Sequence, residues 1–172
     1  DLVEDSTFIN NTAVTSGSSG GNGGAVYSGG NSIVNIVDSV FIDNYAVDKN
    51  GLEDAGIYVY GSGTSSSTLS ISNSVILPRE GHTGVALYVC DGATATAENN
   101  FWGDNSKANT NANVEKWVIM SADYNQEESI LTVAFNSTNS TDGTIAEYDG
   151  VLPDGFNVSV RSSSGGLDEI LP

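Results

Sequence analysis

Three tyrosines recur at nearly equal spacing and form the first candidate binding surface. Tyr27, Tyr58 and Tyr88 lie thirty-one and thirty residues apart, each directly after an apolar residue. If those apolar neighbours point into a core, strand alternation sends the three phenol rings outward as a column. Such a column could stack against sugar rings or anchor a partner protein. The competing interpretation is that the rings lie under a loop or a neighbouring domain, or that the column is turned inward.

The best local cluster for acid–base chemistry is His82, which lies close in sequence to Arg79 and Glu80. Polysaccharide lyases need a basic residue beside carboxylates, and glycoside hydrolases need two or three carboxylates that converge on one sugar. Pro78 and Gly81 lie in the same stretch, and because proline and glycine are common in turns, they favour a surface turn instead. We therefore expect no catalytic residue in this chain and interpret it as a protein that is not an enzyme.

Carboxylates also recur near the predicted loops, at Asp38, Asp43, Asp48 and positions 53–54. Carboxylates of neighbouring loops could share a Ca²⁺ ion, although no spacing matches an EF-hand or a glycine-rich calcium repeat. Solvated turns explain the same residues without a ligand. We expect no required cofactor and assign no metal ligand, and Ca²⁺ stays the one candidate ion.

Four asparagines begin N-glycosylation sequons, which are compatible with an exported protein. In a chain this rich in asparagine, serine and threonine, some sequons arise by chance. The four candidate positions are Asn10, Asn136, Asn139 and Asn157.

The charge balance excludes one class of partner. Five basic residues stand against twenty-two acidic ones, which gives a net charge of −17. Binding to nucleic acid or to an anionic membrane surface needs the opposite sign of charge. No apolar stretch approaches the length of a membrane span, so we expect no membrane insertion. Cys90 is the only cysteine, and no intrachain disulfide can form.

The elements that would position these residues come from an internal repeat. Residues 5–11 return as residues 38–44 with serine, phenylalanine, isoleucine and asparagine in the same places, and fainter copies follow at 73–77 and 99–102. Self-similarity at a period of twenty to fifty residues is typical of solenoids. The asparagines that close the first two copies, Asn11 and Asn44, are expected to bond the turn backbone.

Two further columns complete each repeat. One ends in the tyrosines, and the other comprises residues 33–36, 68–71 and 94–97, where apolar and polar residues alternate as in a half-buried strand. This pattern predicts three short strands per coil. We expect Phe8, Phe41, Ile76 and Trp102 inside, with Trp102 plugging the end where the third column shrinks to alanine. The interior residues predicted for the third column are Val34, Ile36, Leu69, Ile71, Ala95 and Ala97.

The repeat stops after residue 103. A polar stretch at 104–113 is predicted to be a linker, and longer alternating strands follow at 117–120, 130–135 and 156–160. That second pattern predicts the opening strands of an antiparallel β-sandwich. We therefore divide the chain into a parallel β-helix at 1–103, a linker at 104–113, and an Ig-like β-sandwich at 114–172 that is expected to be incomplete.

The repeat resembles a known family of surface proteins. Gly-Gly-Ala-Val at 23–26, combined with Phe-x-x-Asn at 8–11 and 41–44, resembles the repeats of polymorphic outer-membrane proteins and, more closely, of the adhesin-like surface proteins of methanogenic archaea. The Asn-Asn-Phe-Trp-Gly stretch at 99–103 looks like the junction of those chains with a following domain. Residues 151–158 are similar to the Pro-Asp-Gly turn and strand of invasin-type Ig-like domains.

What the resemblance implies is an extracellular, cell-surface protein with a pectate-lyase-like, right-handed parallel β-helix of about three to four coils. It implies contact with other cells, surface proteins, host surfaces or polysaccharides, and it implies no catalytic residue. The alternative is a carbohydrate-active β-helix, either a lyase, a hydrolase or a degenerate relative that only binds. An outward cleft with Arg or Lys and at least two carboxylates would favour this alternative.

Overall fold

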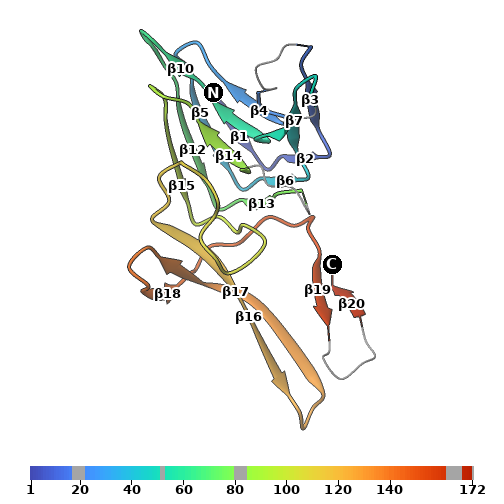
Figure 1. Cartoon of the computed structure of the whole chain (residues 1–172). Coiled ribbons are helices and arrows are strands. Elements are labelled where there is room, and N and C mark those ends of the chain that lie inside the picture. Colours follow the sequence, from blue (N-terminus) through green and yellow to red (C-terminus); the bar gives the residue numbers. More distant parts are fainter. Residues whose placement is uncertain (17–21, 51–52, 80–84, 162–167, 172) are drawn as a thin grey trace.

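A computed structural model describes residues 1–16, 22–50, 53–79, 85–161 and 168–171. Within these residues the chain forms strands and turns and no helix (Figure 1). Most of the sheets are small and parallel, and the antiparallel strands gather toward the C-terminus. The predicted all-β class is confirmed. Among these residues no helix is long and apolar enough to cross a membrane.

The chain runs through the same set of parallel sheets three times and begins a fourth circuit, and each circuit, complete or not, is called a pass here. The passes cover residues 2–28, 33–59, 68–89 and 94–102. The longest sheet takes one strand from each pass, and in order these strands are β1 (Leu2–Glu4), β5 (Ile33–Val37), β12 (Thr68–Ser72) and β15 (Thr94–Glu98).

The second and third sheets each take one strand from the first three passes. The second contains β2 (Thr7–Ile9), β6 (Val40–Ile42) and β13 (Val75–Leu77). The third contains β4 (Val26–Ser28), β9 (Ile57–Val59) and β14 (Leu87–Val89). The strand columns proposed from the sequence are thus confirmed in order and register.

A further sheet was missed by the prediction of three strands per repeat. It pairs β3 (Thr12–Val14) with β7 (Tyr45–Val47) in parallel, and β8 (Glu53–Asp54) then pairs with β7 in antiparallel. The shared Ala-Val in these two strands was the available signal, but three-residue strands give too little alternation to stand out. A small hairpin, β10 (Gly61–Ser62) with β11 (Ser65–Ser66), projects from the second pass.

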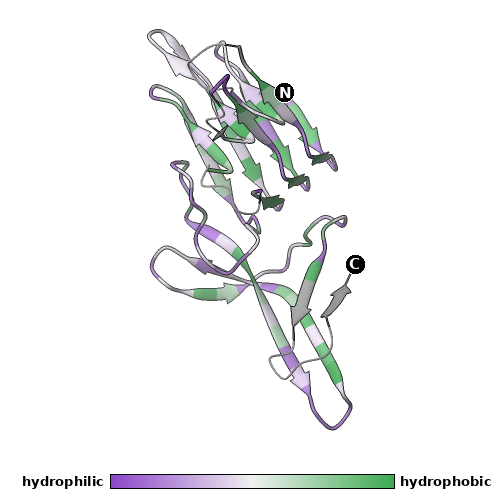
Figure 2. Cartoon of the chain, turned by 45° about the vertical axis from the view of Figure 1, so that its right-hand side comes forward, coloured by the Kyte–Doolittle hydropathy of each residue, from purple (hydrophilic) through white to green (hydrophobic). Residues whose placement is uncertain are grey.

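The interior between the sheets is filled by alternate residues of each strand. Along β5, Val34 and Ile36 are buried whereas Asn35 is exposed, as the alternation predicted. The strands of the parallel sheets carry green, apolar segments in Figure 2. Burial confirms the expected interior for Val34, Ile36, Phe41, Leu69, Ile71, Ile76, Ala95, Ala97 and Trp102. Phe8, by contrast, is only half-buried.

A repeated left-handed turn joins the first sheet to the second. Asp5, Asp38, Asn73 and Asn99 have φ values of 48°, 49°, 50° and 58°. Aspartate and asparagine adopt this conformation more readily than other side chains because their short polar groups bond locally. The residue type at this one position therefore sets the corner of every pass.

A column of polar side chains follows these turns, half-buried at Ser6 and buried at the other three positions, and we call Ser6, Ser39, Ser74 and Asn100 the serine ladder. The backbone N–H of Ser6 donates to the Oγ of Ser39 at 3.2 Å, and the N–H of Ser39 donates to the Oγ of Ser74 at 3.1 Å. The N–H of Ser74 donates to Oδ1 of Asn100 at 2.9 Å. Each serine hydroxyl also donates to the carbonyl two residues earlier. Stacked passes are thus joined by side chains as well as by strand pairing.

The expected asparagine bonds to the backbone are confirmed for Asn44 at the end of the second sheet, whereas the Asn11 side chain donates to the Asn44 side chain. The Oδ1 of Asn44 accepts from the backbone N–H and the side-chain amide of Asn11, at 3.0 and 2.9 Å. The Asn44 amide donates to the carbonyl of Phe8 at 2.8 Å. The rings of Phe8 and Phe41 stack with centroids 4.7 Å apart and planes 3° apart. In the third pass Arg79 replaces asparagine, and its guanidinium lies 4.5 Å over the ring of Tyr45.

The segment at 104–113, predicted to be a linker, packs across the end of the stack. Asn113 pairs with Thr96, donates its N–H to the carbonyl of Ala95 and accepts from the N–H of Ala97. The side chain of Asn111 binds both backbone groups of Val89, accepting at 2.8 Å and donating at 2.6 Å. This segment therefore caps the last strands of two sheets rather than hanging free between two units.

An antiparallel hairpin follows the cap and extends away from the passes (Figure 1). It joins β16 (Lys116–Asn125) to β17 (Ile130–Ser140), with β18 (Ile145–Glu147) on the outer side of β17. A separate pair, β19 (Val158–Arg161) and β20 (Asp168–Leu171), is also antiparallel. These strands confirm the change from parallel to antiparallel pairing.

Candidate binding surfaces

The tyrosine column exists, but its middle member is buried. Tyr27, Tyr58 and Tyr88 occupy paired positions of β4, β9 and β14. Their exposed fractions are 52%, 8% and 37%. The three rings form the stacked column that the sequence predicted, and Tyr58 is buried within it between Tyr27 and Tyr88. The accessible part of the column consists of its outer members.

Ring geometry decides what the column can offer to a ligand. Tyr27 stacks on Tyr58 with centroids 6.1 Å apart, and Tyr58 lies 5.3 Å from Tyr88. Tyr60, which the sequence reading did not single out, stacks on Tyr27 at 6.2 Å. Among the described rings, Tyr27 and Tyr58 each contact two others and Tyr88 contacts one, so the faces of the rings are partly covered, and sugar stacking needs an open ring face. The column is suited to hydrogen bonding through its hydroxyl edges more than to flat stacking.

Gly29 controls the position of the outermost ring. A Cβ placed on Gly29 would lie 2.8 Å from Cε1 of Tyr27, so the ring rests directly over the glycine backbone. A side chain at residue 29 would displace the ring from its stack. The sequence reading did not single out Gly29, because only the fold shows that Tyr27 folds back over it.

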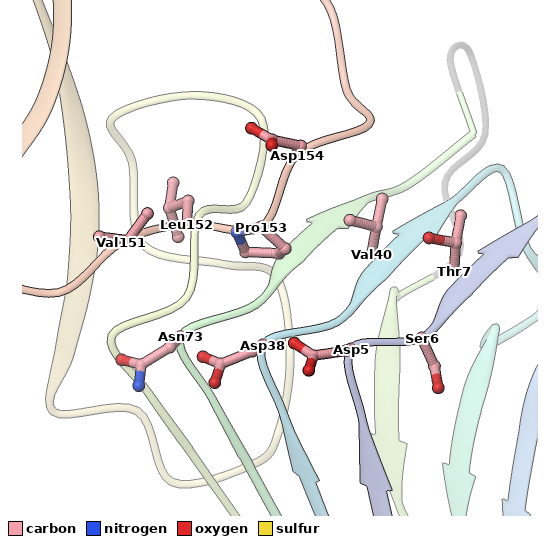
Figure 3. A pocket seen from close by; sticks show the side chains of 10 residues that line it. All are labelled: Asp5, Ser6, Thr7, Asp38, Val40, Asn73, Val151, Leu152, Pro153 and Asp154. Atoms are coloured by element: carbon pink, nitrogen blue, oxygen red, sulfur yellow. The ribbon is translucent and has the colours of Figure 1, made fainter.

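A second surface is an acidic groove of about 600 Å³, shown in Figure 3. Asp5, Asp38 and Asn73 line one side in a row, because they occupy the left-handed turns of successive passes. Residues 151–154 form the opposite side and contribute the carboxylate of Asp154. The sequence reading noted Asp38 as a loop carboxylate. It missed the groove because the opposite wall comes from at least 78 residues further along the chain.

Tyr148 joins the two walls of this region. Its hydroxyl donates to Oδ1 of Asn73 at 3.3 Å. Burial raises the pKa of Tyr148 above its ordinary value of 10.0, and the negative charges of Asp38 and Asp149 raise it further. The phenol therefore stays protonated and acts as a donor to the turn.

Arg79 has a partner outside the proposed acid–base cluster. A hydrogen bond with Thr12 lowers the pKa of Tyr45, and the nearby charge of Arg79 also lowers it. Arg79 itself lies over the Tyr45 ring. Its two proposed neighbours, Glu80 and His82, lie outside the described residues, so the proposed cluster stays a prediction.

The sequon asparagines differ in accessibility. Asn10, Asn136 and Asn157 are exposed, and Asn10 sits at a left-handed turn with φ 55°. Asn139 is half-buried, and its Oδ1 accepts from the N–H of Ser140 at 2.9 Å. The three exposed positions are better placed for a glycan than Asn139. Glycosylation itself stays a prediction.

The carboxylates proposed for Ca²⁺ do not converge where their side chains are described. In that part of the chain, no three His, Cys, Asp or Glu residues are grouped so as to hold a metal ion. Asp48 is buried and accepts from the N–H and side chain of Asn50, at 2.7 and 3.2 Å. The side chains of 53–54 lie outside the described residues, and Ca²⁺ binding remains untested.

No protein-family model, curated protein or solved structure matches this chain. The two surfaces described above are therefore interpreted from their own geometry.

Proposed function

We propose that this chain is a non-catalytic adhesin or surface-display module that acts at the cell surface. In this proposal the four passes are coils of a right-handed parallel β-helix, and the antiparallel strands after the cap begin an Ig-like sandwich. The proposal rests on the repeat motifs and on the way each pass returns in register to the same sheets. Its partners are glycans or proteins of other cells or surfaces.

The observation that carries the proposal is the stacked tyrosine column. Tyr27 and Tyr88 are exposed on a face whose strands are held in register by parallel pairing. Their stacking with Tyr58 fixes the rings before a ligand arrives, which lowers the entropy cost of binding. Ordered hydroxyls at fixed spacing suit a polar polymer such as a polysaccharide.

Conservative substitutions test this surface. We expect the double variant Tyr27→Phe/Tyr88→Phe to lose binding on a glycan array and in a cell-binding assay, because it keeps the ring stack and removes the hydroxyls. Tyr124→Phe is the matched control, since Tyr124 is also an exposed tyrosine, at the end of β16 and outside the column. Unchanged binding by a Tyr27→Ser/Tyr88→Ser variant would remove the column from the proposal.

The acidic groove meets part of the criterion for the alternative, a carbohydrate-active protein: it gathers carboxylates, although no Arg or Lys is among its lining residues in the described part of the chain. Asp5, Asp38 and Asp154 line one concave surface. Most glycoside hydrolases use a pair of carboxylates as their catalytic residues. Incubation with acidic and neutral polysaccharides would release reducing ends if this alternative holds. Asp38→Asn should then abolish the release, whereas the adhesin proposal predicts that no product forms with either protein.

A further inference from the structure

A polar groove of about 520 Å³ lies where the capping segment at 104–113 meets the hairpin, outside the two surfaces described above. The capping segment contributes Lys107, and the start of β16 contributes Lys116. The end of β17 and the turn into β18 form the other wall, with Thr138 and Thr144 among their residues. Ligand pockets usually measure roughly 300–1,000 Å³, so this groove is large enough for a small ligand.

The two lysines set this groove apart in so acidic a protein. Five basic residues stand against twenty-two acidic ones, and two of the five line this one groove. Lys107 and Lys116 are both exposed, and within the described residues neither ammonium group forms an ion pair with a carboxylate. Such ammonium groups can donate charge-assisted hydrogen bonds to an anionic oxygen. The groove therefore offers two positive charges to a ligand.

A second groove of about 490 Å³ extends the first, because Asn113, Glu115 and Lys116 line both. It continues to Thr96 and Glu98 of β15. Hydroxyl, amide and charged side chains make up most of the residues along both grooves. An extended groove of this composition suits a polyhydroxylated chain, because such a ligand can donate and accept hydrogen bonds along its whole length.

Two of the carboxylates beside the lysines already have partners within the fold. Both oxygens of Glu98 accept hydrogen bonds, from the N–H groups of Glu115 at 2.8 Å and Lys116 at 3.1 Å. Asp142 accepts from the hydroxyl of Ser140 and from a backbone N–H of the same turn, and these hydrogen bonds lower its pKa to about 2. Asp142 is thus ionised and unsuited to act as a general acid, although the groove combines lysines with carboxylates.

Thr138 is an independent sign of a ligand. It is 5% exposed and lines the groove, yet its hydroxyl has no hydrogen-bond partner within the described residues. Its two neighbours across the strands, Val118 and Ala146, have no polar side-chain group to offer. A covered hydroxyl without a partner is costly, so such groups normally bond to protein, water or a ligand. The partner of this hydroxyl is therefore expected from the groove.

The net charge of −17 does not exclude an anionic group from this groove. At about 0.15 M ionic strength the screening length is about 8 Å, so exposed carboxylates further away interact weakly with a bound group. The charges that such a group meets are those of the groove itself.

We propose that this groove binds an acidic saccharide without cleaving it. Lys107 and Lys116 would bind the carboxylate of a uronic acid, and Thr138 would bond to a sugar hydroxyl. The inference rests on the proposed function in that the partner is a glycan, but it names the class of glycan and places it on a surface apart from the tyrosine column.

A labelled oligosaccharide tests the proposal on the whole chain at about 0.15 M ionic strength. The probe is a fluorescent hexasaccharide of alternating glucuronate and N-acetylglucosamine, and its control is the same hexasaccharide with the carboxyl groups reduced to alcohols. We expect saturable binding of the probe by fluorescence anisotropy and at least tenfold weaker binding of the control. Equal binding of the two, or binding of neither, would overturn the proposal. Recovery of shorter fragments after incubation would contradict binding without cleavage.

Substitution of the lysines locates the site. Lys107→Gln/Lys116→Gln should bind the probe at least tenfold more weakly, because it removes both positive charges. Lys49→Gln is the matched control, since Lys49 is an exposed lysine outside the groove, and it should bind as the parent does. Lys107→Arg/Lys116→Arg keeps the charges and should keep most of the affinity. Equal affinity of the double glutamine variant and the parent would exclude this groove.

Thr138→Val separates binding from folding. Valine keeps the shape of threonine and removes a hydroxyl that has no partner within the described fold, so the melting temperature should not fall. Affinity for the probe should fall several-fold. A lower melting temperature with unchanged affinity would show that the hydroxyl is structural and contradict its assignment to the ligand.

The variant Tyr27→Phe/Tyr88→Phe distinguishes this groove from the tyrosine column. We expect it to bind the acidic hexasaccharide as the parent does, whether or not it loses other glycans. Loss of the hexasaccharide in this variant would assign the sugar to the column and overturn the proposal for the groove. Failure of the column to bind any glycan would leave the result at the groove unchanged.

Discussion

At the scale of single residues, polar side chains hold this fold together from inside its turns. The asparagine contacts could be predicted, because asparagine at the end of a strand commonly bonds a turn. The serine ladder could not, since alternation treats every serine as a surface residue. Ser39 and Ser74 are completely buried, and each bridges two backbone groups.

The serine ladder predicts a graded loss of stability. We expect Ser39→Ala and Ser74→Ala each to lower the free energy of unfolding by about 1–3 kcal/mol. Each substitution removes the hydroxyl and leaves backbone groups without their hydrogen-bond partner. Ser6→Ala should cost less, since water reaches the first pass. Urea unfolding of the three variants checks the order. A larger loss for Ser6→Ala than for Ser74→Ala would contradict it.

Trp102 also acts at this scale, as the expected plug of the last pass. It is buried in one cluster with Ala95 and Ala97, the small residues that leave room for it. Trp102→Ala should open a cavity and cost about 3–5 kcal/mol. Trp102→Phe should cost less, because the indole N–H has no hydrogen-bond partner to lose among the described residues. Circular dichroism is the suitable probe, since the substitution removes a fluorophore. A change near zero for alanine would refute the plug.

At the scale of elements, the stretch at 104–113 shows the limit of composition as a guide. Its asparagine-rich sequence is typical of a linker, yet the side-chain amide of Asn111 occupies the edge of β14 and the backbone of Asn113 occupies the edge of β15. The strand columns were predictable because their alternation repeats three times. The capping segment occurs only once, so it has no repeat that would reveal it. From a single sequence it therefore cannot be distinguished from an ordinary loop.

The loop that carries Tyr148 is coupled to the turns of the stack, and this predicts a pH dependence. The folded state keeps the phenol protonated above pH 10, whereas the unfolded state ionises near its ordinary pKa of 10.0. Stability from this group is therefore fully present below pH 10 and is lost as pH rises through the higher folded pKa. Unfolding measured from pH 8 to 11.5 should show a steeper alkaline fall for the parent than for Tyr148→Phe. An equal alkaline loss of stability in the parent and in Tyr148→Phe would contradict the raised pKa of Tyr148.

At the scale of the whole molecule, the two ends of the stack differ in kind. One end is closed by the segment at 104–113, through the side chain of Asn111 and the backbone of Asn113, and continues into the antiparallel hairpin. At the other end the first-pass strands are the terminal members of their sheets among the described residues. The sequence predicted the repeat, the order of the columns and the change of pattern after 103. It could not predict which end is closed, because closure depends on contacts between the last pass and residues beyond the repeat.

The net charge of −17 predicts that salt stabilises the fold. Like charges repel in the compact state, and the screening length falls from about 30 Å at 0.01 M to about 8 Å at 0.15 M ionic strength. The melting temperature should therefore rise between these two concentrations of sodium chloride. Substitution of exposed Glu127 and Glu128 by glutamine should reduce the rise. A melting temperature that does not change with salt would show that repulsion is already compensated.

The buried Asn100 has a mechanical consequence. Its carbonyl accepts the N–H of Val118 from the hairpin, while its side chain holds Ser74 and the carbonyl of Ile71 in the third pass. Asn100 and Trp117 pair in parallel. Tension applied along β16 would therefore act as a shear force on the hydrogen bonds of Asn100 and load them at the same time, instead of breaking them one after another. A pull on the hairpin would thus reach the serine ladder directly, and the stack would resist it as one body.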